Sequence, residues 1–210
     1  AEAGLSVFVF DKGRAGQEAT WAGGGIISPL YPWRYAPSIT ALATWSQQAF
    51  PDLIASLNEL TGIDSELSTE GMLVTATDER EQALAWGVGL SPKVIEISDE
   101  EARVLEPNVQ LDETPLWMPR VSSVRSSRMG RALRQACLNH PKIQLLEYRE
   151  VILSGDLDSP KVSSQSQRYV GGRVVLAAGA WTGNMFTGVK LSCPIKPMKG
   201  QMLLFGPCDL

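Results

Sequence analysis

The chain has 210 residues, of which 44% are hydrophobic and 20% are charged, and these proportions predict a globular fold with a sizeable core rather than intrinsic disorder. Nineteen basic residues against 23 acidic ones give a net charge of -4, which supplies no positive field for a phosphate backbone, so nucleic acid is not an expected partner. No apolar run reaches the roughly 18 to 20 residues that a membrane helix needs, and no charged and then apolar leader is visible, so no membrane span is expected.

The first part of the chain predicts one strand followed by a long loop. The first five residues resemble the last turn of a helix that closes on Gly4, which predicts that this helix starts before residue 1. The apolar run Val7–Phe10 predicts a strand buried on both faces, as in a parallel sheet. Residues 13–37 contain five glycines and three prolines, which predict a loop with a short helical turn near Ala22.

The middle of the chain predicts alternating helices and strands. Apolar residues recur at helical spacing over Ser38–Leu60, with a stop at Gly62 and a kink or a break at Pro51. Strands are expected at Met72–Thr75 and Val94–Ile97.

Two capping boxes are predicted in the same part of the chain. Asp78 and Glu81 have the required spacing at the start of the helix expected over Asp78–Trp86. Ser98 and Glu101 repeat that spacing before a second, shorter helix.

The last part of the chain predicts one helix and several strands. Ser126–Asn139 is the helix, and its three arginines, Arg128, Arg131 and Arg134, are expected on a solvated face. Ser159–Gln167 is polar, which predicts a loop or the tip of a hairpin. Strands are expected at Ile143–Leu146, at Val151–Leu153 and, with the strongest signal in the chain, over Arg173–Gly179.

Cysteine and histidine are too sparse for several kinds of site. The three cysteines, Cys137, Cys193 and Cys208, are far apart and outside any C-x-x-C spacing, so neither a disulfide framework nor a zinc site is expected, and a reducing, cytoplasmic compartment is favoured. With His140 as its one histidine, the chain has no multi-histidine metal site, and a Ser-His-Asp triad is not expected.

Asp11 is the first candidate for a ligand-binding residue. In dinucleotide-binding βαβ units a buried strand ends in an acidic residue, whose carboxylate accepts hydrogen bonds from the ribose hydroxyls of the adenosine half. Asp11 follows the strand Val7–Phe10 in this way, although an aspartate at a strand end can equally start a turn. No G-x-G-x-x-G occurs in the 210 residues, and such a fingerprint is expected just before residue 1.

Two runs of small residues are further candidates. Gly16–Ile27 includes Thr20 and three successive glycines, which let a backbone approach an anionic or flat ligand closely. The same glycines could instead form a hinge or a close contact between protein elements. Val174–Gly183 is an apolar strand that leads into small residues, and it is either a ligand-lining strand end or a plain core strand with a turn.

Together these segments resemble the flavin-dependent amine oxidoreductases of the D-amino-acid oxidase and sarcosine oxidase type, most closely the glycine oxidases of thiamine biosynthesis. The matching stretches are 10–13, 20–27, 28–35, 69–72, 178–183 and 197–201. The resemblance implies a mixed α/β and α+β fold, in which a Rossmann-like FAD-binding domain is interrupted by an antiparallel-sheet substrate domain, both incomplete. The implied FAD-binding domain is 1–37 with 119–195, and the implied substrate domain is 38–118 with 196–210.

The resemblance also implies FAD as the cofactor and a role for ten residues. Asp11 would bind the adenosine ribose with Lys12 beside it, and Ala19 and Thr20 would contact the pyrophosphate. Gly24, Gly25 and Ile26 would lie at the isoalloxazine ring. Val151 would meet the adenine through its backbone, and Ala178 and Gly179 would line the FAD cleft.

The reaction that the resemblance implies is oxidation of glycine or another small amine to the imine. A hydride passes from the α-carbon to flavin N5, and O₂ then reoxidises the flavin and yields hydrogen peroxide. In this family, arginines and tyrosines in later strands bind the substrate carboxylate, and the chain stops at Leu210 before them. No catalytic residue is therefore assigned, and Tyr31, Arg34 and Tyr35 are interpreted as a loop face or lid.

Two alternatives stay open at this point. The fold could serve a dehydrogenase of D-amino acids or N-methyl amines such as sarcosine, with a membrane quinone as the electron acceptor. The chain could also be a catalytically inactive fragment, since the glycine fingerprint and the substrate arginines are absent from it. A homo-oligomer is compatible with either reading.

Overall fold

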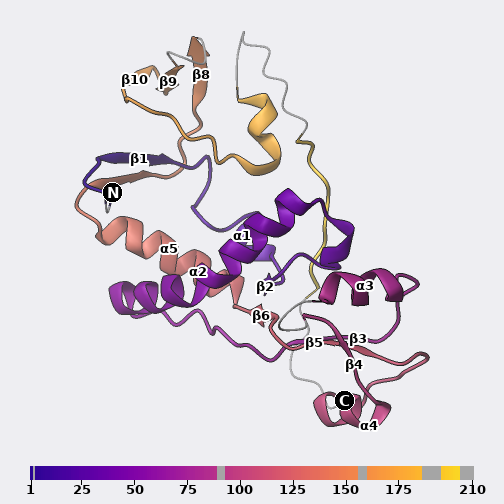
Figure 1. The fold of residues 1–210 in the computed structure, drawn as a ribbon. Helices are drawn as coiled ribbons and strands as arrows, with labels where there is room; N and C mark the ends of the chain where they lie inside the picture. The colour runs from indigo at the N-terminus through magenta and orange to yellow at the C-terminus, as the bar shows by residue number, and fades with distance from the viewer. Residues whose placement is uncertain (2, 89–92, 156–159, 186–194, 204–210) are drawn as a thin grey trace. The chain divides into compact units, whose positions relative to one another are not determined.

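The computed structural model of the chain (Figure 1) describes residues 1, 3–88, 93–155, 160–185 and 195–203. The backbone forms two compact units, Ala1–Gly23 with Leu133–Leu210, and Gly24–Ala132. Ser159, at the start of the predicted polar loop, and the cysteines Cys193 and Cys208 lie outside the described residues.

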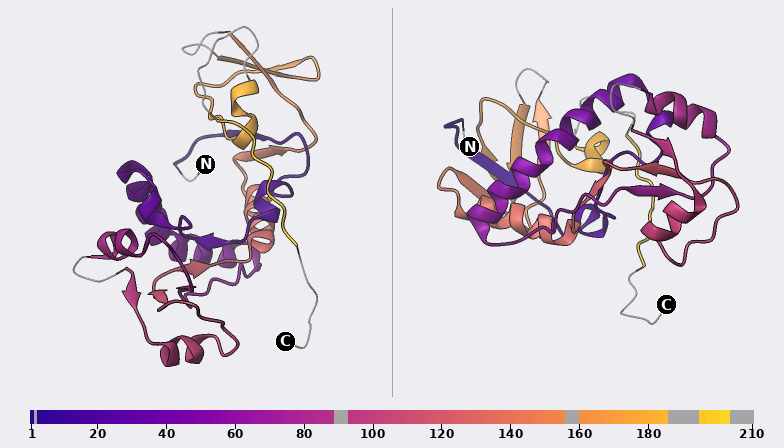
Figure 2. Two further views of the ribbon diagram at one scale, coloured as in Figure 1. Left: turned by 90° about the vertical axis from the view of Figure 1, so that its right-hand side faces the viewer. Right: turned by 60° about the horizontal axis from the view of Figure 1, so that its bottom comes forward.

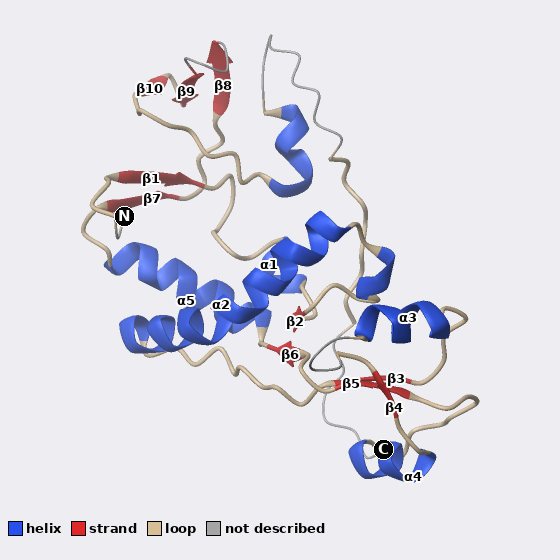
Figure 3. Cartoon of the chain, in the orientation of Figure 1, coloured by secondary structure: helices blue, strands red, loops and turns tan. Residues whose placement is uncertain are grey.

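The first unit contains a parallel strand pair and a small antiparallel sheet, coloured red in Figure 3. The parallel pair joins β1 (Val7–Phe10) to β7 (Ile143–Leu146), with Val7 opposite Ile143. The antiparallel sheet has the order β10–β9–β8, and its strands are β8 (Ile152–Gly155), β9 (Pro160–Ser164) and β10 (Gln167–Tyr169). Two short helical elements complete the unit, α1 (Ala19–Ala22) and the 3₁₀ helix η2 (Gly179–Asn184).

A tight turn explains the β9–β10 hairpin. Gln165 and Ser166 both have left-handed backbone, with φ of 46° and 67°, as a two-residue hairpin turn of the primed type requires. The predicted hairpin tip is therefore confirmed, but β9 extends into the stretch expected to be loop. Tyr169 of β10 packs edge-on against Phe10 of β1, with ring centroids 4.7 Å apart.

Two strand predictions in this unit need correction. Val7–Phe10 pairs in parallel as expected, but it is not buried on both faces, because Phe8 is 46% exposed. Arg173–Gly179 forms no strand among the described residues, and Val175 is 87% exposed. Apolar, β-branched residues favour a strand only when a neighbouring strand offers its edge, and no described strand pairs with this segment.

The second unit is built around a three-stranded antiparallel sheet of order β3–β5–β4. Its strands are β3 (Met72–Val74), β4 (Ile95–Glu96) and the central β5 (Leu116–Met118). A smaller pair joins β2 (Ile26–Ile27) to β6 (Ser122–Ser123). A buried cluster on this sheet forms the core, and its members are Val74, Ala83, Val94, Leu116, Met118 and Val121.

Helices accompany these strands, and Figure 2 follows them from two further directions. They are the 3₁₀ helix η1 (Pro32–Arg34), α2 (Pro37–Thr61), α3 (Arg80–Gly87) and α4 (Asp99–Leu105). The helix α5 (Ser126–Asn139) begins in the second unit and ends in the first, and it matches its prediction at both ends. No helix in the described part of the chain is long and apolar enough to cross a membrane.

The long helix α2 ends where the sequence predicts but is not split. Gly62 closes it with a left-handed φ of 68°, and its N–H donates to the Asn58 carbonyl at 2.8 Å. Pro51 lies inside the continuous helix. A proline removes one backbone hydrogen bond, and here the turns on both sides carry the helix past it.

One of the two predicted capping boxes is confirmed. Ser98 accepts a hydrogen bond from the Glu101 N–H, and the Glu101 carboxylate accepts from the Ser98 N–H at 2.8 Å. The Asp78 box is wrong, because α3 starts at Arg80 and Glu79 is therefore its N-cap residue. The Glu79 N–H instead donates to the Thr77 hydroxyl at 3.2 Å.

Candidate functional site

Asp11 lies directly after β1, at the carboxyl end of the parallel pair. Its Oδ1 accepts a hydrogen bond from the Gly13 N–H at 2.8 Å, which fixes the half-buried carboxylate in a tight turn. Oδ2 has no hydrogen-bond partner within the described residues. The carboxyl ends of parallel strands meet at one edge, where ligands of open α/β sheets bind. Asp11 thus starts a turn and still has an oxygen available to accept a further hydrogen bond.

Lys12 connects this turn to the segment after residue 178. Its Nζ lies 3.7 Å from a Glu18 carboxylate oxygen and 4.3 Å from the centroid of the Trp181 ring. Such an ammonium–aromatic contact is attractive and favours this arrangement. Trp181 belongs to η2, which begins at Gly179 with a left-handed φ of 54°. The structure therefore brings Lys12 to Trp181, two residues after the predicted residue Gly179.

The other predicted residues of the first unit are Val151, Ala19 and Thr20. The Arg149 N–H donates to the Asp11 carbonyl at 2.9 Å, which places Val151 two residues beyond that contact and one residue before β8. Ala19 and Thr20 form the first turn of α1 and are exposed.

Gly24, Gly25 and Ile26 belong to the second unit. Gly25 has a φ of 79°, and a Cβ built on it would lie 1.9 Å from the Val124 carbonyl oxygen. The Val124 N–H donates to the Gly25 carbonyl at 2.9 Å. Gly25 therefore makes a close contact between protein backbones, the alternative that its glycine pattern had left open. Gly24 is exposed, and Ile26 in β2 keeps 49% of its surface exposed.

Glu147 and Trp181 are two residues of this region that sequence reasoning missed as site residues. Glu147 follows β7, and its carboxylate accepts from the Ala15 N–H at 2.8 Å and from Arg134 Nε at 2.8 Å. The Arg134 guanidinium lowers the pKa of Glu147 from 4.5 to about 2, with the Ala15 hydrogen bond acting in the same direction. The signal that could have found it is an acidic residue placed after a strand, as Asp11 is.

The predicted solvated arginine face needs correction at two positions. The Arg134 side chain is only 23% exposed and binds Glu147 through both Nε and Nη2. Arg128 Nε lies 3.1 Å from a Glu66 carboxylate oxygen. Both side chains turn back toward acidic groups of neighbouring loops, because a planar guanidinium matches a carboxylate well.

The loop that contains Tyr31 and Arg34 is held against the start of α3 by Glu79, the N-cap residue of that helix. Arg34 Nε donates to Glu79 Oε2 at 2.6 Å, and Trp33 Nε1 donates to the same oxygen at 2.7 Å. These hydrogen bonds lower the pKa of Glu79 and raise that of Arg34. Tyr31 has a left-handed φ of 53° and lies 4.4 Å beneath the Arg34 guanidinium. Arg34 is thus paired with Glu79 at the start of α3.

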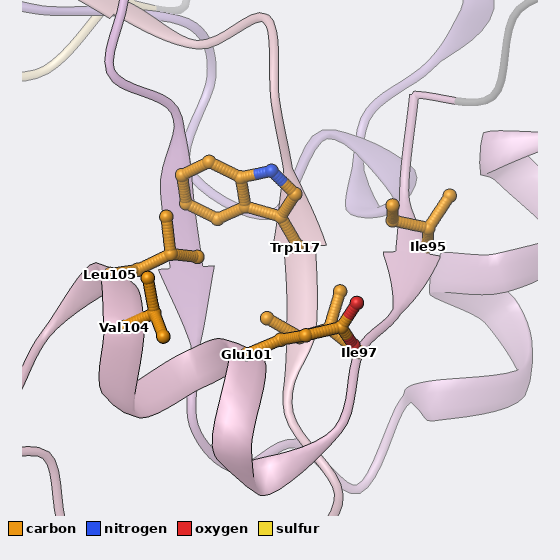
Figure 4. A pocket seen from close by; sticks show the side chains of 6 residues that line it. All are labelled: Ile95, Ile97, Glu101, Val104, Leu105 and Trp117. Carbon is orange, nitrogen blue, oxygen red and sulfur yellow. The ribbon is translucent and has the colours of Figure 1, made fainter.

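A pocket of about 350 Å³ in the second unit contains none of the predicted residues. Figure 4 shows that side chains of α4 and of the sheet surround it, and they are Ile95, Ile97, Glu101, Val104, Leu105 and Trp117. Its one carboxylate, that of Glu101, already accepts the capping hydrogen bond from Ser98. The pocket is therefore an apolar gap with one charged group, the Glu101 carboxylate, whose Oε2 caps α4.

The described part of the chain was compared with two kinds of reactive site, a metal site and a reactive thiol. No group of three or more His, Cys, Asp or Glu residues there could hold a metal ion. Cys137 is half-buried, and burial raises the pKa of its thiol, which disfavours a reactive thiolate.

Comparison with known proteins identifies the family. The family described as "DAO: FAD dependent oxidoreductase" matches residues 1–210. The chain belongs to this family. It is 39% identical to a glycine oxidase of Pseudomonas aeruginosa, in a match that covers 98% of this chain and 57% of that protein. It is 38% identical to a glycine oxidase of Pseudomonas putida, in a match that covers 95% of this chain and 55% of that protein. The chain thus spans little more than half the length of these relatives.

A solved structure agrees with the fold. The crystal structure of glycine oxidase from Geobacillus kaustophilus superposes with a TM-score of 0.73 at 25% identity, and covers 85% of this chain and 50% of that one. The expected mixed α/β fold with small antiparallel sheets is thereby confirmed.

The residues present fit one end of an FAD molecule. A ribose offers two hydroxyl donors, and Asp11 keeps a carboxylate oxygen available for them at the carboxyl end of β1. Gly13, two residues further on, holds the other oxygen of this carboxylate through its N–H.

Proposed function

We propose that this chain forms part of an FAD site in which Asp11 binds the ribose of the adenosine half. The observation that carries the proposal is the Asp11 carboxylate at the end of the parallel β1–β7 pair, with Oδ1 held by Gly13 and Oδ2 unpaired within the described residues. An ionised carboxylate accepts hydrogen bonds from hydroxyl groups strongly, which suits the two adjacent hydroxyls of a ribose.

The other nine residues have proposed roles along the same cofactor. Lys12 lies beside the ribose, Ala19 and Thr20 contact the pyrophosphate, and Val151 meets the adenine through its backbone. The isoalloxazine ring and the rest of the cleft are contacted by Gly24, Gly25 and Ile26, and by Ala178 and Gly179. The contacts of Lys12 with Glu18 and Trp181 support its place next to the segment of Gly179.

The proposed reaction is the oxidative deamination of glycine or a similar small amine, in thiamine biosynthesis. The names of the two Pseudomonas relatives support the oxidation of glycine. FAD, when bound, supplies the hydride acceptor for oxidation of the amine to the imine, and O₂ is then reduced to hydrogen peroxide. No residue of this chain is assigned a catalytic role, and we place the protein in the cytoplasm.

The cofactor proposal is tested by titrating the purified protein, with its natural termini, with FAD and following the quenching of tryptophan fluorescence and the flavin absorption band. We expect Asp11→Ala to weaken FAD binding at least tenfold, because the ribose hydroxyls lose their acceptor. Asp52→Ala, an exposed position in α2, is the matched control and should bind as the wild type does. Equal affinities of the wild type and Asp11→Ala would contradict the assignment.

The substrate is tested separately, by oxygen uptake and peroxide release with glycine, sarcosine and D-alanine, using the protein with its natural termini. Uptake with glycine supports the proposal. Uptake with sarcosine or D-alanine but not with glycine would replace the proposed substrate. Reduction of a quinone without oxygen uptake would replace the proposed acceptor.

A further inference from the structure

The turn that contains Asp11 is tied to the segment after β7 by backbone hydrogen bonds. The Asp11 N–H donates to the Leu146 carbonyl at 3.0 Å, and the Arg149 N–H donates to the Asp11 carbonyl at 2.9 Å. The Tyr148 N–H donates to the Gly13 carbonyl at 3.0 Å. Three backbone hydrogen bonds therefore tie the turn to the segment after β7, beyond the last residue pair of the parallel strands, Phe10 and Leu146.

One side chain reinforces this arrangement. Glu147 Oε1 accepts from the Ala15 N–H at 2.8 Å, four residues after Asp11. The same carboxylate is held from the other side by Arg134 of α5, through Nε at 2.8 Å and Nη2 at 2.6 Å. Both side chains are mostly covered, with 15% of Glu147 and 23% of Arg134 exposed.

Glu147 thus fixes the far end of the turn, while Asp11 starts it. Its carboxylate satisfies all three donors at once, so it has a defined position rather than a range of rotamers. Loop residues keep a ligand-binding geometry only when neighbouring groups hold them, and a misplacement of about 1 Å is costly. Removal of the carboxylate would leave the Ala15 N–H without this acceptor and free the turn to move.

Building on the FAD site proposed above, we propose that Glu147 is a positioning residue for the adenosine end of the cofactor. It acts through the Ala15 N–H and the Arg134 guanidinium, and holds the Asp11–Ala15 turn so that the Asp11 carboxylate faces the ribose. Glu147 therefore contributes to the recognition of FAD through a protein contact rather than as one of the ten residues assigned to the cofactor.

FAD and FMN together test this inference, because FMN lacks the adenosine half. We expect Glu147→Ala to weaken FAD binding about tenfold or more and to change FMN binding less than twofold. Arg134→Ala should weaken FAD binding by a smaller factor, since the Glu147–Ala15 contact remains. The matched control is Glu96→Ala, which removes the ion pair with Arg80 in the second unit and should leave both affinities unchanged.

Each outcome separates the inference from the proposed function. If the wild-type protein with its natural termini binds no FAD, the proposed function fails and the inference fails with it. If Asp11→Ala loses FAD while Glu147→Ala binds it normally, only the inference is overturned. An equal loss of FAD and FMN in Glu147→Ala would show a general structural defect and would also overturn it.

A second variant covers the case in which Glu147→Ala does not fold. Glu147→Gln keeps the size of the side chain and one oxygen for the Ala15 N–H, but loses the charge that attracts Arg134. Its FAD affinity should fall between those of the wild type and the alanine variant. Hydrogen exchange at the Ala15 amide should speed up in Glu147→Gln and not in Glu96→Ala, and unchanged exchange would overturn the inference.

Discussion

Gly25 shows how a single residue can have a structural requirement within a segment proposed to bind a cofactor. Its left-handed φ of 79° disfavours any side chain, and the Val124 carbonyl occupies the place of a Cβ at 1.9 Å. The glycine is therefore needed for the contact between β2 and the residues after β6, whatever ligand lies near it. The neighbouring residue Gly24 is exposed.

Gly25→Ala should destabilise the chain by about 3 kcal/mol, because it adds a steric overlap to the cost of left-handed backbone. Gly62→Ala is the matched control, since Gly62 has a φ of 68° but nothing within 4 Å of the added Cβ. It should cost only about 1 kcal/mol. Urea unfolding followed by circular dichroism measures both, and equal losses would contradict the steric argument.

The ion pair between Glu147 and Arg134 should make the free energy of unfolding depend on pH. The pKa of Glu147 is about 2 in the folded chain against an ordinary value of 4.5, so its contribution is complete above pH 4.5 and is lost as the pH falls toward 2. The charged groups that face it are Arg134 and Arg14. Glu147→Gln should therefore be less stable than the wild type by about 1 to 2 kcal/mol at pH 6, and this difference should shrink by pH 3. A difference that stays constant with pH would be incompatible with the lowered pKa.

At this scale, part of the candidate site could be predicted from the sequence. Asp11 was proposed from the sequence because an apolar strand that ends in an acidic residue is a local pattern, and the structure places it at the carboxyl end of the parallel pair. Glu147 was missed because its partners, Ala15 and Arg134, are distant in the chain, and Ala15 contributes only its backbone. Trp181 was missed for the same reason, since its contact with Lys12 depends on the fold.

The starts of α4 and α3 show when neighbouring residues in the sequence determine where a helix begins. The Ser98–Glu101 box is complete within four residues, and the structure forms it. Asp78 and Glu81 have the same spacing, but the Glu79 carboxylate is bound by Trp33 and Arg34, and the helix begins one residue later than the pattern requires. A tertiary contact has overridden the local signal there.

Ser98→Ala should therefore destabilise the chain by about 1 kcal/mol, because the Glu101 N–H loses its side-chain acceptor. Asp78→Ala is the matched control and should change stability by less than about 0.5 kcal/mol, because Asp78 caps no helix. Thermal and urea unfolding of both variants would check this. A larger loss for Asp78→Ala than for Ser98→Ala would reverse the assignment of the two caps.

At the scale of the whole molecule, the structure differs from the sequence prediction where pairing partners decide the outcome. Most helices and strands were located, since their periodicity and caps are local. The clearest failure is Arg173–Gly179, whose composition is that of a buried strand but which no described strand joins. Val174 and Leu176 are half-buried while Val175 is exposed, so the segment keeps the alternation of an extended chain without the hydrogen bonds of a sheet.

Hydrogen–deuterium exchange of the 210-residue chain can test this view directly. Amides protected by strand pairing exchange slowly, and unpaired extended segments exchange within seconds. We expect fast exchange across residues 173–178 and slow exchange in β5, which pairs on both sides with β3 and β4. The strand β1 is the matched control, because its composition is equally apolar and it pairs with β7 on one edge, so its exchange should be intermediate. Exchange across 173–178 as slow as in β5 would mean that this segment belongs to a sheet after all.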